Sequence, residues 1–114
     1  MIKVYIVNRG GHNYDDAERF GQLVFCTEGS IDKLDTSQIF RELTDSFEGS
    51  HPEDYILLMS LASLCSVACA MFAAKHNTLN LLVHTNDGYV ARHLNLKDKH
   101  DKRVTRAKLL SKER

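Results

Sequence analysis

Residues 55–74 read YILLMSLASLCSVACAMFAA, twenty positions without a charged residue, a proline or a glycine. The first five, from Tyr55 to Met59, form the short apolar block that is typical of a buried strand. Ser60 then supplies a hydroxyl that can cap the free N–H groups of a following helix. Residues 61–75 are rich in alanine, leucine and methionine, which favour helix. The run therefore predicts a buried strand that leads directly into a buried helix.

A run of this length also has to be tested as a membrane span, which needs about 20 mostly apolar residues. Eight of its positions are serine or alanine, which contribute little to transfer into lipid, and the chain has no tryptophan. Basic residues do not cluster beside the run either. We therefore expect no membrane segment.

The segments around this run alternate between strand and helix patterns. Blocks of β-branched and aromatic residues predict strands at 2–7, 22–27, 79–83 and 89–94, and the Asp87-Gly88 pair predicts a hairpin between the last two. Residues 14–21 predict a short helix that ends at Gly21. The predicted fold class is α/β: a single layered domain with a mixed sheet of about five strands, an antiparallel C-terminal hairpin and two main helices.

The first of the two main helices is predicted from Asp35 to about Phe47. Asp35 and Gln38 form a capping box at its start. Its apolar positions are expected to face the core as one stripe: Ile39, Phe40, Leu43 and Phe47.

Composition and cysteine content indicate a cytoplasmic globular protein. The apolar fraction of 43% and the charged fraction of 26% are ordinary for soluble domains, and residues 1–3 lead into a strand without a secretory signal. The three cysteines, Cys26, Cys65 and Cys69, are an odd number, and two of them lie in the apolar run. Their spacing with His76 matches no common zinc site, so we expect buried free thiols, no metal and no cofactor.

Charge is distributed unevenly along the chain. Residues 97–114 hold eight basic and three acidic residues, a net charge of +5, and residues 1–96 carry the balancing −5. We expect an α/β domain over 1–96 and a basic tail over 97–114 that is either disordered or a helix that docks on a partner. Nucleic acid is expected to bind, if at all, only through this tail, which has no aromatic residue for stacking on bases.

Three segments are expected to meet at one edge of the predicted sheet, because ligands of α/β folds bind beyond the carboxyl ends of parallel strands. Glycines there allow close approach of the backbone, a helix N-terminus favours an anion, and an arginine offers paired donors to phosphate or carboxylate. The candidate ligand-binding residues are Arg9, Gly10, Gly11, His12, Ser60, Ser63 and His84. The pattern indicates a pocket for a nucleotide-like or other anionic ligand, although Arg-Gly-Gly-His is neither a dinucleotide-binding fingerprint nor a P-loop. The structural alternative is a glycine turn beside a surface arginine.

Catalysis is a further alternative at the same edge. His12 with Asp15 or Asp16 could act as acid and base in phosphoester chemistry, although a surface histidine and two helix-capping acids explain the same residues. The sequence does not hold a nucleophile, a base and an orienting group together, so an enzyme is not the favoured reading.

The buried helix predicts self-association. Residues 61–75 have almost no polar face, and a chain of 114 residues covers such a helix on all sides only with difficulty. We therefore expect a homodimer or larger assembly through this helix. An interaction module that engages a host macromolecule, through the acidic domain or the basic tail, remains the main alternative to ligand binding.

Three stretches of the sequence resemble known proteins: NRGGHNYDDAERFG at 8–21, PEDYILL at 52–58 and LNLL at 79–82. The resemblance would cover residues 1–96. Together they resemble a group of small uncharacterised proteins encoded by bacteriophages. The resemblance implies an accessory protein that acts in the cytoplasm of an infected bacterium, where such proteins often bind a host protein or a small metabolite. It implies no activity.

Overall fold

The computed structural model describes residues 1–97, and the predicted basic tail from 98 onwards lies outside the described residues. The elements follow the order β1 (Lys3–Ile6), the 3₁₀ helix η1 (Asp15–Phe20), β2 (Gln22–Phe25), α1 (Thr36–Phe47), β3 (Tyr55–Leu58), α2 (Ala62–His76), β4 (Thr78–Thr85) and β5 (Gly88–Asn95).

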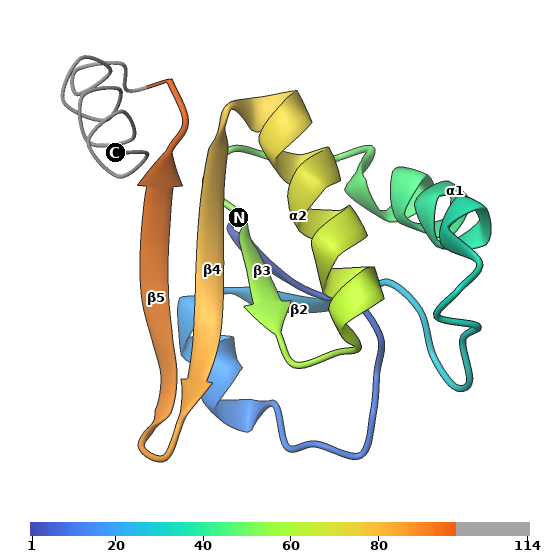
Figure 1. Cartoon of the computed structure of the whole chain (residues 1–114). Coiled ribbons are helices and arrows are strands. Elements are labelled where there is room, and N and C mark those ends of the chain that lie inside the picture. Colours follow the sequence, from blue (N-terminus) through green and yellow to red (C-terminus); the bar gives the residue numbers. More distant parts are fainter. Residues whose placement is uncertain (98–114) are drawn as a thin grey trace, which may run out of the picture.

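The five strands form one mixed sheet in the order β2-β1-β3-β4-β5. Strands β2, β1, β3 and β4 run parallel, and β5 returns antiparallel to β4 through a tight turn (Figure 1). The predicted α/β class, the mixed sheet and the C-terminal hairpin are confirmed. Because β1, β3 and β4 are parallel, their carboxyl ends lie at the same edge of the sheet, toward which the arrowheads of β3 and β4 point downward in Figure 1.

The sheet has a different cover on each face. Helices α1 and α2 lie on one face, where Ile39, Leu43 and Phe47 of α1 pack with Leu64 and Phe72 of α2. The short η1 helix covers the other face, where the second cluster contains Tyr14, Ala17, Leu57, Leu82 and Tyr89. Burying each large apolar side chain contributes about 1.5–3 kcal/mol, so both clusters stabilise the sheet.

The uncharged run divides as predicted, into β3 and α2 with a three-residue connection, Met59 to Leu61. Helix α2 ends at Asn77, which adopts the left-handed conformation (φ 55°) common at helix C-termini. Among residues 1–97, no helix combines the length and the apolar character that crossing a membrane requires.

Helix α1 confirms its predicted start and corrects one of its predicted core residues. The carboxylate of Asp35 accepts a hydrogen bond from Gln38 N at 3.0 Å, which is one half of the predicted capping box. The other half is absent, because Asp35 N donates to Asp32 O and the Gln38 side chain bonds to Glu42 and Arg41. Phe40, however, is 53% exposed. Successive residues are about 100° apart on a helix, so Ile39 and Phe40 point in different directions and only Ile39 reaches the core.

The η1 helix, on the face opposite α1 and α2, also contacts the β4–β5 hairpin. Asp16 accepts a hydrogen bond from Tyr89 N at 2.8 Å, and its other oxygen lies 3.1 Å from Arg19 Nε. Gly88 has φ +111°, and a Cβ there would come within 2.5 Å of Asp16 Oδ2. Position 88 therefore requires glycine both for its backbone conformation and for the close approach of η1.

Candidate functional site

The strand order places the candidate site between β1 and β3. From β1 the chain crosses to β2 on one side, whereas β3 and β4 lie on the other, so the loops after β1 and β3 diverge at this point. Crevices at such switch points are the usual binding sites of open α/β sheets. A pocket of about 440 Å³ opens here, lined by Asn8, Gly10, His12, Leu58, Met59, Ser60 and Leu61. We call it the switch-point pocket.

The loop after β1 is held in place mainly through Asn8. Its amide group donates to Gly29 O at 3.1 Å and accepts from Thr27 Oγ1 at 2.9 Å. The backbone of the next turn is fixed by Gly10 N, which donates to the hydroxyl of Tyr14 at 3.0 Å. One wall of the pocket is therefore preorganised by contacts with the loop after β2 and with Tyr14, the residue before η1.

The predicted helix cap at Ser60 is wrong. The residue at the N-cap position of α2 is Leu61, and no side chain caps the helix. Ser60 Oγ instead lies 3.2 Å from Asn8 N, from which it accepts a hydrogen bond, and 3.4 Å from Asn8 O. Its hydroxyl is therefore engaged in joining the loops after β1 and β3.

Helix α2 consequently begins beside the pocket with free donors. The first helical bond runs from Cys65 N to Leu61 O, so the N–H groups of Ala62, Ser63 and Leu64 have no partner within the helix. The Ser63 hydroxyl is buried and has no hydrogen-bond partner in the described part of the chain. An uncapped helix N-terminus carries partial positive charge, which favours a negatively charged group.

A second pocket of about 480 Å³ adjoins the first and shares Gly10 and His12 with it. We call it the arginine pocket. The Arg9 guanidinium stacks on Phe25, 4.5 Å from the ring centroid, and lies 3.5 Å from Glu28. The remaining lining residues are Gly11, Asn13, Tyr14, Asp15, Glu18 and Leu23. An aromatic floor, a stacked arginine and two carboxylates suit a planar polar group better than a bare anion.

The structure groups the predicted site residues only in part. Arg9, Gly10, Gly11 and His12 line one pocket, and Gly10, His12 and Ser60 line the other. Ser63 lies in the first turn of α2 but lines neither pocket. His84 also lies outside both, on the exposed end of β4, with its ring 5.4 Å from that of Tyr89.

The acidic residues considered for catalysis have different surroundings. Hydrogen bonds from Tyr89 N–H and from Arg19 hold the pKa of Asp16 below its usual value, so this carboxylate is fixed as an anion in a structural contact. Asp15 lines the arginine pocket with His12. Within residues 1–97, no hydrogen bond joins the His12 ring to Asp15 or Asp16.

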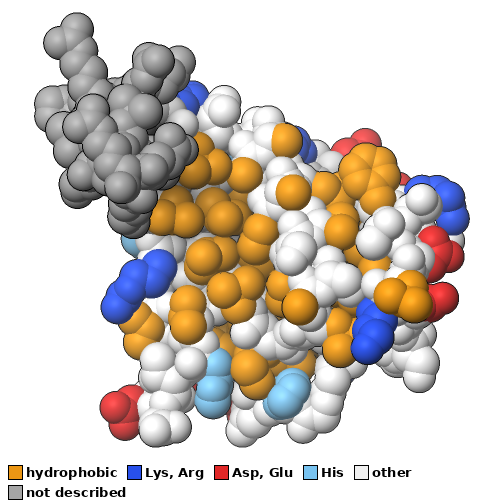
Figure 2. All heavy atoms as spheres, viewed as in Figure 1, with side chains coloured by type: hydrophobic (Ala, Val, Ile, Leu, Met, Phe, Trp, Pro, Cys, Tyr) orange, Lys and Arg blue, Asp and Glu red, His pale blue; other side chains and the backbone are white. Residues whose placement is uncertain are grey.

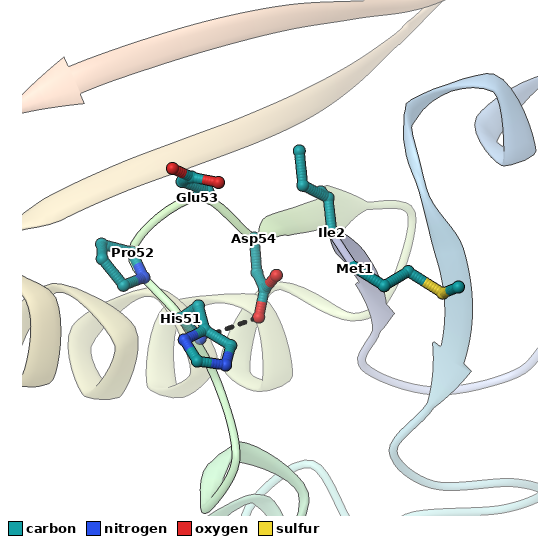
Figure 3. A pocket seen from close by; sticks show the side chains of 6 residues that line it. All are labelled: Met1, Ile2, His51, Pro52, Glu53 and Asp54. Carbon is teal, nitrogen blue, oxygen red and sulfur yellow. Dashed lines mark hydrogen bonds between the residues drawn. The ribbon is translucent and has the colours of Figure 1, made fainter.

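A polar network that the sequence analysis missed lies at the opposite end of the sheet, around a pocket of about 390 Å³ lined by Met1, Ile2, His51, Pro52, Glu53 and Asp54 (Figure 3). Asp54 is fully buried, and its two oxygens accept hydrogen bonds from Lys3 N and His51 N, each at 2.9 Å. Burial and the nearby Asp54 carboxylate raise the pKa of Tyr5 to about 12. The only hint of this role in the sequence was the pair of acids, Glu53 and Asp54, directly before a strand.

The Ser50–His76 contact in this region does not form a nucleophile and base. Ser50 Oγ lies 2.8 Å from His76 Nε2, but the hydroxyl donates its single proton to Phe47 O at 2.8 Å. Nε2 must therefore carry a proton and donate it to Ser50, so the ring nitrogen cannot accept the hydroxyl proton. Burial lowers the pKa of His76, which favours this neutral form. The contact ties the end of α1 to the end of α2.

Residues 1–97 contain no group of three or more histidine, cysteine or acidic side chains that could hold a metal ion. Burial raises the pKa of Cys26 and of Cys69 to about 11, so both thiols are protonated at neutral pH.

Comparison with known proteins identifies the family of this chain. Residues 2–97 match the model of a family described as Phage Pam3 gp32-like protein. No match was found among curated proteins or among solved structures.

Proposed function

The chain belongs to the Phage Pam3 gp32-like protein family, and we propose that it is a phage accessory protein that binds a nucleotide-like or other anionic ligand without catalysis in the cytoplasm of the infected bacterium. The observation that carries the proposal is the switch-point pocket, where α2 begins without a side-chain cap beside Gly10, His12 and Ser60.

The chemistry of this pocket supports an anionic group. Its lining contains one ionisable side chain, that of His12, and no carboxylate that would repel an anion. Gly10 leaves room for the ligand to approach the backbone, since a Cβ there would find no heavy atom nearer than 3.5 Å. A phosphate is the group that the uncapped N–H donors of a helix accommodate best.

The adjoining arginine pocket supports a ligand that is larger than phosphate. The stacked Arg9 and Phe25 provide a flat surface, and Asp15 and Glu18 can accept hydrogen bonds from ring amino groups or sugar hydroxyls. A molecule that places its phosphate in one pocket and its ring in the other would use His12 in both. This combination favours a nucleotide-like ligand over a simple inorganic anion.

Thermal unfolding with a panel of nucleotides, pyrophosphate and phosphate tests the proposal. A ligand at about 100 times its Kd stabilises the native state by about 2.7 kcal/mol, so the Tm should rise with concentration for nucleotides and less for phosphate. His12→Ala should abolish the shift. Arg92→Ala, which removes an exposed arginine on β5, is the matched control and should leave it unchanged.

A charge placed at the start of α2 separates loss of binding from loss of folding. Ala62 is exposed at the first helical position, where a carboxylate favours the helix. Ala62→Glu should therefore keep or raise the Tm of the free protein and remove the nucleotide shift, whereas Ala62→Gln should retain most of it. If no member of the panel shifts the Tm of the wild type, the proposal fails and the host-interaction alternative takes its place.

Phosphoester hydrolysis is the remaining alternative, and the fixed role of Asp16 in holding the hairpin argues against it. Turnover of a generic phosphodiester that is lost in His12→Ala would replace binding with catalysis as the function.

A further inference from the structure

Phe40 is an exposed aromatic residue on a helix whose other apolar side chains are buried. It is 53% exposed, whereas Ile39, Leu43 and Phe47 of the same helix are at most 4% exposed. Burying a phenylalanine side chain stabilises a protein by about 1.5–3 kcal/mol, and a single copy of this chain lacks most of that stabilisation at position 40.

Two hollows flank Phe40. The larger, about 720 Å³, lies between α1 and α2 and is lined by Phe40, Thr44, Asp45, Phe47, Glu48, Met71, Ala74 and Lys75. The smaller, about 430 Å³, is lined by Thr36, Ser37, Phe40, Arg41 and Val67. The same face thus carries both an exposed aromatic ring and a recess with apolar walls. In a two-fold interface each copy presents the same surface, so that surface must contain both the group that inserts and the recess that receives it.

Helix α2 extends this face with side chains that allow close approach. Its exposed positions Ala62, Ser66, Ala70 and Ala74 are small and recur every four residues. Figure 2 shows small hydrophobic side chains scattered among white atoms over α2, a denser hydrophobic area to the left of α2, and charged side chains of both signs at the right-hand margin over α1.

The charges on α1 identify the occupant as a second copy. Arg41 and Asp45 lie one turn apart beside Phe40, and neither forms a salt bridge in residues 1–97. Two α1 helices packed antiparallel about a two-fold axis would place each Arg41 opposite Asp45 of the second copy, twice over. Such a surface is complementary in charge to itself.

From this self-complementarity we infer that the α1–α2 face is the interface of a symmetric homodimer, in which Phe40 of each copy occupies the larger hollow of the other. The sequence predicted self-association through α2 alone. The structure assigns the central contact to α1, with Met71 and Ala74 of α2 forming the far wall of the hollow.

Sedimentation equilibrium of the full chain over about 1–100 µM tests the dimer. The wild type should show the mass of a dimer at the upper end. Phe40→Glu should raise the dissociation constant at least about 30-fold. The matched control is Leu34→Glu, at an 82% exposed leucine in the loop before α1, and it should leave the dissociation constant unchanged.

Mixing two charge variants tests the antiparallel geometry. In a homodimer of Arg41→Glu each new glutamate would face Asp45 of the other copy, and in a homodimer of Asp45→Arg each new arginine would face Arg41. Both homodimers would contain two repulsive pairs, so each variant should be monomeric. An equimolar mixture restores both attractive pairs and should form a heterodimer, an outcome that damage within one chain could not produce.

The inference is overturned by a wild type that stays monomeric, by a dimer that Phe40→Glu leaves intact, or by charge variants that remain monomeric when mixed. None of these outcomes depends on ligand binding, so they test the interface independently of the proposed function.

Discussion

The hydroxyl of Ser60 joins the two loops that form the switch-point pocket by contacting both backbone groups of Asn8. Its Oγ lies 3.2 Å from Asn8 N and 3.4 Å from Asn8 O, although the two residues are 52 positions apart in the sequence. The contact fixes the distance between the carboxyl ends of β1 and β3, and with it the width of the candidate site.

Ser60→Ala should therefore loosen the pocket and cost about 1 kcal/mol of stability, the usual net value of one hydrogen bond. Urea unfolding measures the loss, and hydrogen exchange should show faster exchange of the Asn8 amide. Ser30→Ala, which removes an exposed hydroxyl from the loop after β2, is the control and should change neither quantity. Unchanged exchange at Asn8 in the Ser60 variant would contradict the structural role of this contact.

The same serine marks the limit of what the sequence could predict. The division of the apolar run into β3 and α2, the Asp35 cap and the Asp87-Gly88 hairpin all follow from patterns within about ten residues, and all are confirmed. Whether the Ser60 hydroxyl caps its own helix or bonds to Asn8 depends on which strand lies beside β3, and local patterns do not contain that information.

Two other residues show the same limit. Phe40 fits an apolar stripe by spacing, but its exposure depends on where α2 and the sheet leave room for α1. Asp54 appears in the sequence as the second of two adjacent acids before a strand, whereas in the fold it is buried and accepts a hydrogen bond from Lys3 N, 51 positions away. For the candidate site, the glycine loop and His12 could be predicted to lie at the carboxyl edge, but the separation of His84 from them could not.

Asp54→Ala should destabilise the protein severely. The substitution leaves the partly buried N–H groups of Lys3 and His51 without this acceptor, and the loss at each costs on the order of 1 kcal/mol or more. We expect a total of about 3 kcal/mol by urea unfolding, and a smaller loss for Asp54→Asn, whose amide oxygen keeps one acceptor. Glu53→Ala, at the exposed neighbour, should stay within about 0.5 kcal/mol of the wild type. A cost below about 1 kcal/mol for Asp54→Ala would mean that these hydrogen bonds do not hold β1 to β3.

Asp16 should make stability depend on pH in the acidic range. Hydrogen bonds from Tyr89 N–H and Arg19 depress its folded-state pKa below the usual 3.8. A carboxyl group with a lowered folded pKa contributes stability above its unfolded pKa, and this contribution is lost as pH falls through the folded value. Wild-type stability should therefore fall more steeply than that of Asp16→Asn as pH drops below about 4, as urea midpoints at successive pH values would measure. If the urea midpoints of the wild type and of Asp16→Asn fall in parallel as pH decreases, protonation of Asp16 is not linked to stability. Asp87→Asn, at an exposed acid in the adjacent turn, is the control and should follow the wild type.

Cys26 and Cys69 should be almost unreactive in the folded protein. Burial raises the pKa of each thiol from 9.0 to about 11, and only the thiolate reacts with alkylating agents. At pH 8 this change lowers the thiolate fraction about 100-fold, so iodoacetamide should modify both residues at least that much more slowly than in denaturant. Mass spectrometry of peptides from native and unfolded samples, taken at matched times, measures the ratio for each cysteine separately. Native labelling of either residue at the unfolded rate would place its thiol outside the core that α1 and α2 form on the sheet. Slow labelling of both would leave them as apolar packing groups and argue against a redox or metal-binding role for these two thiols.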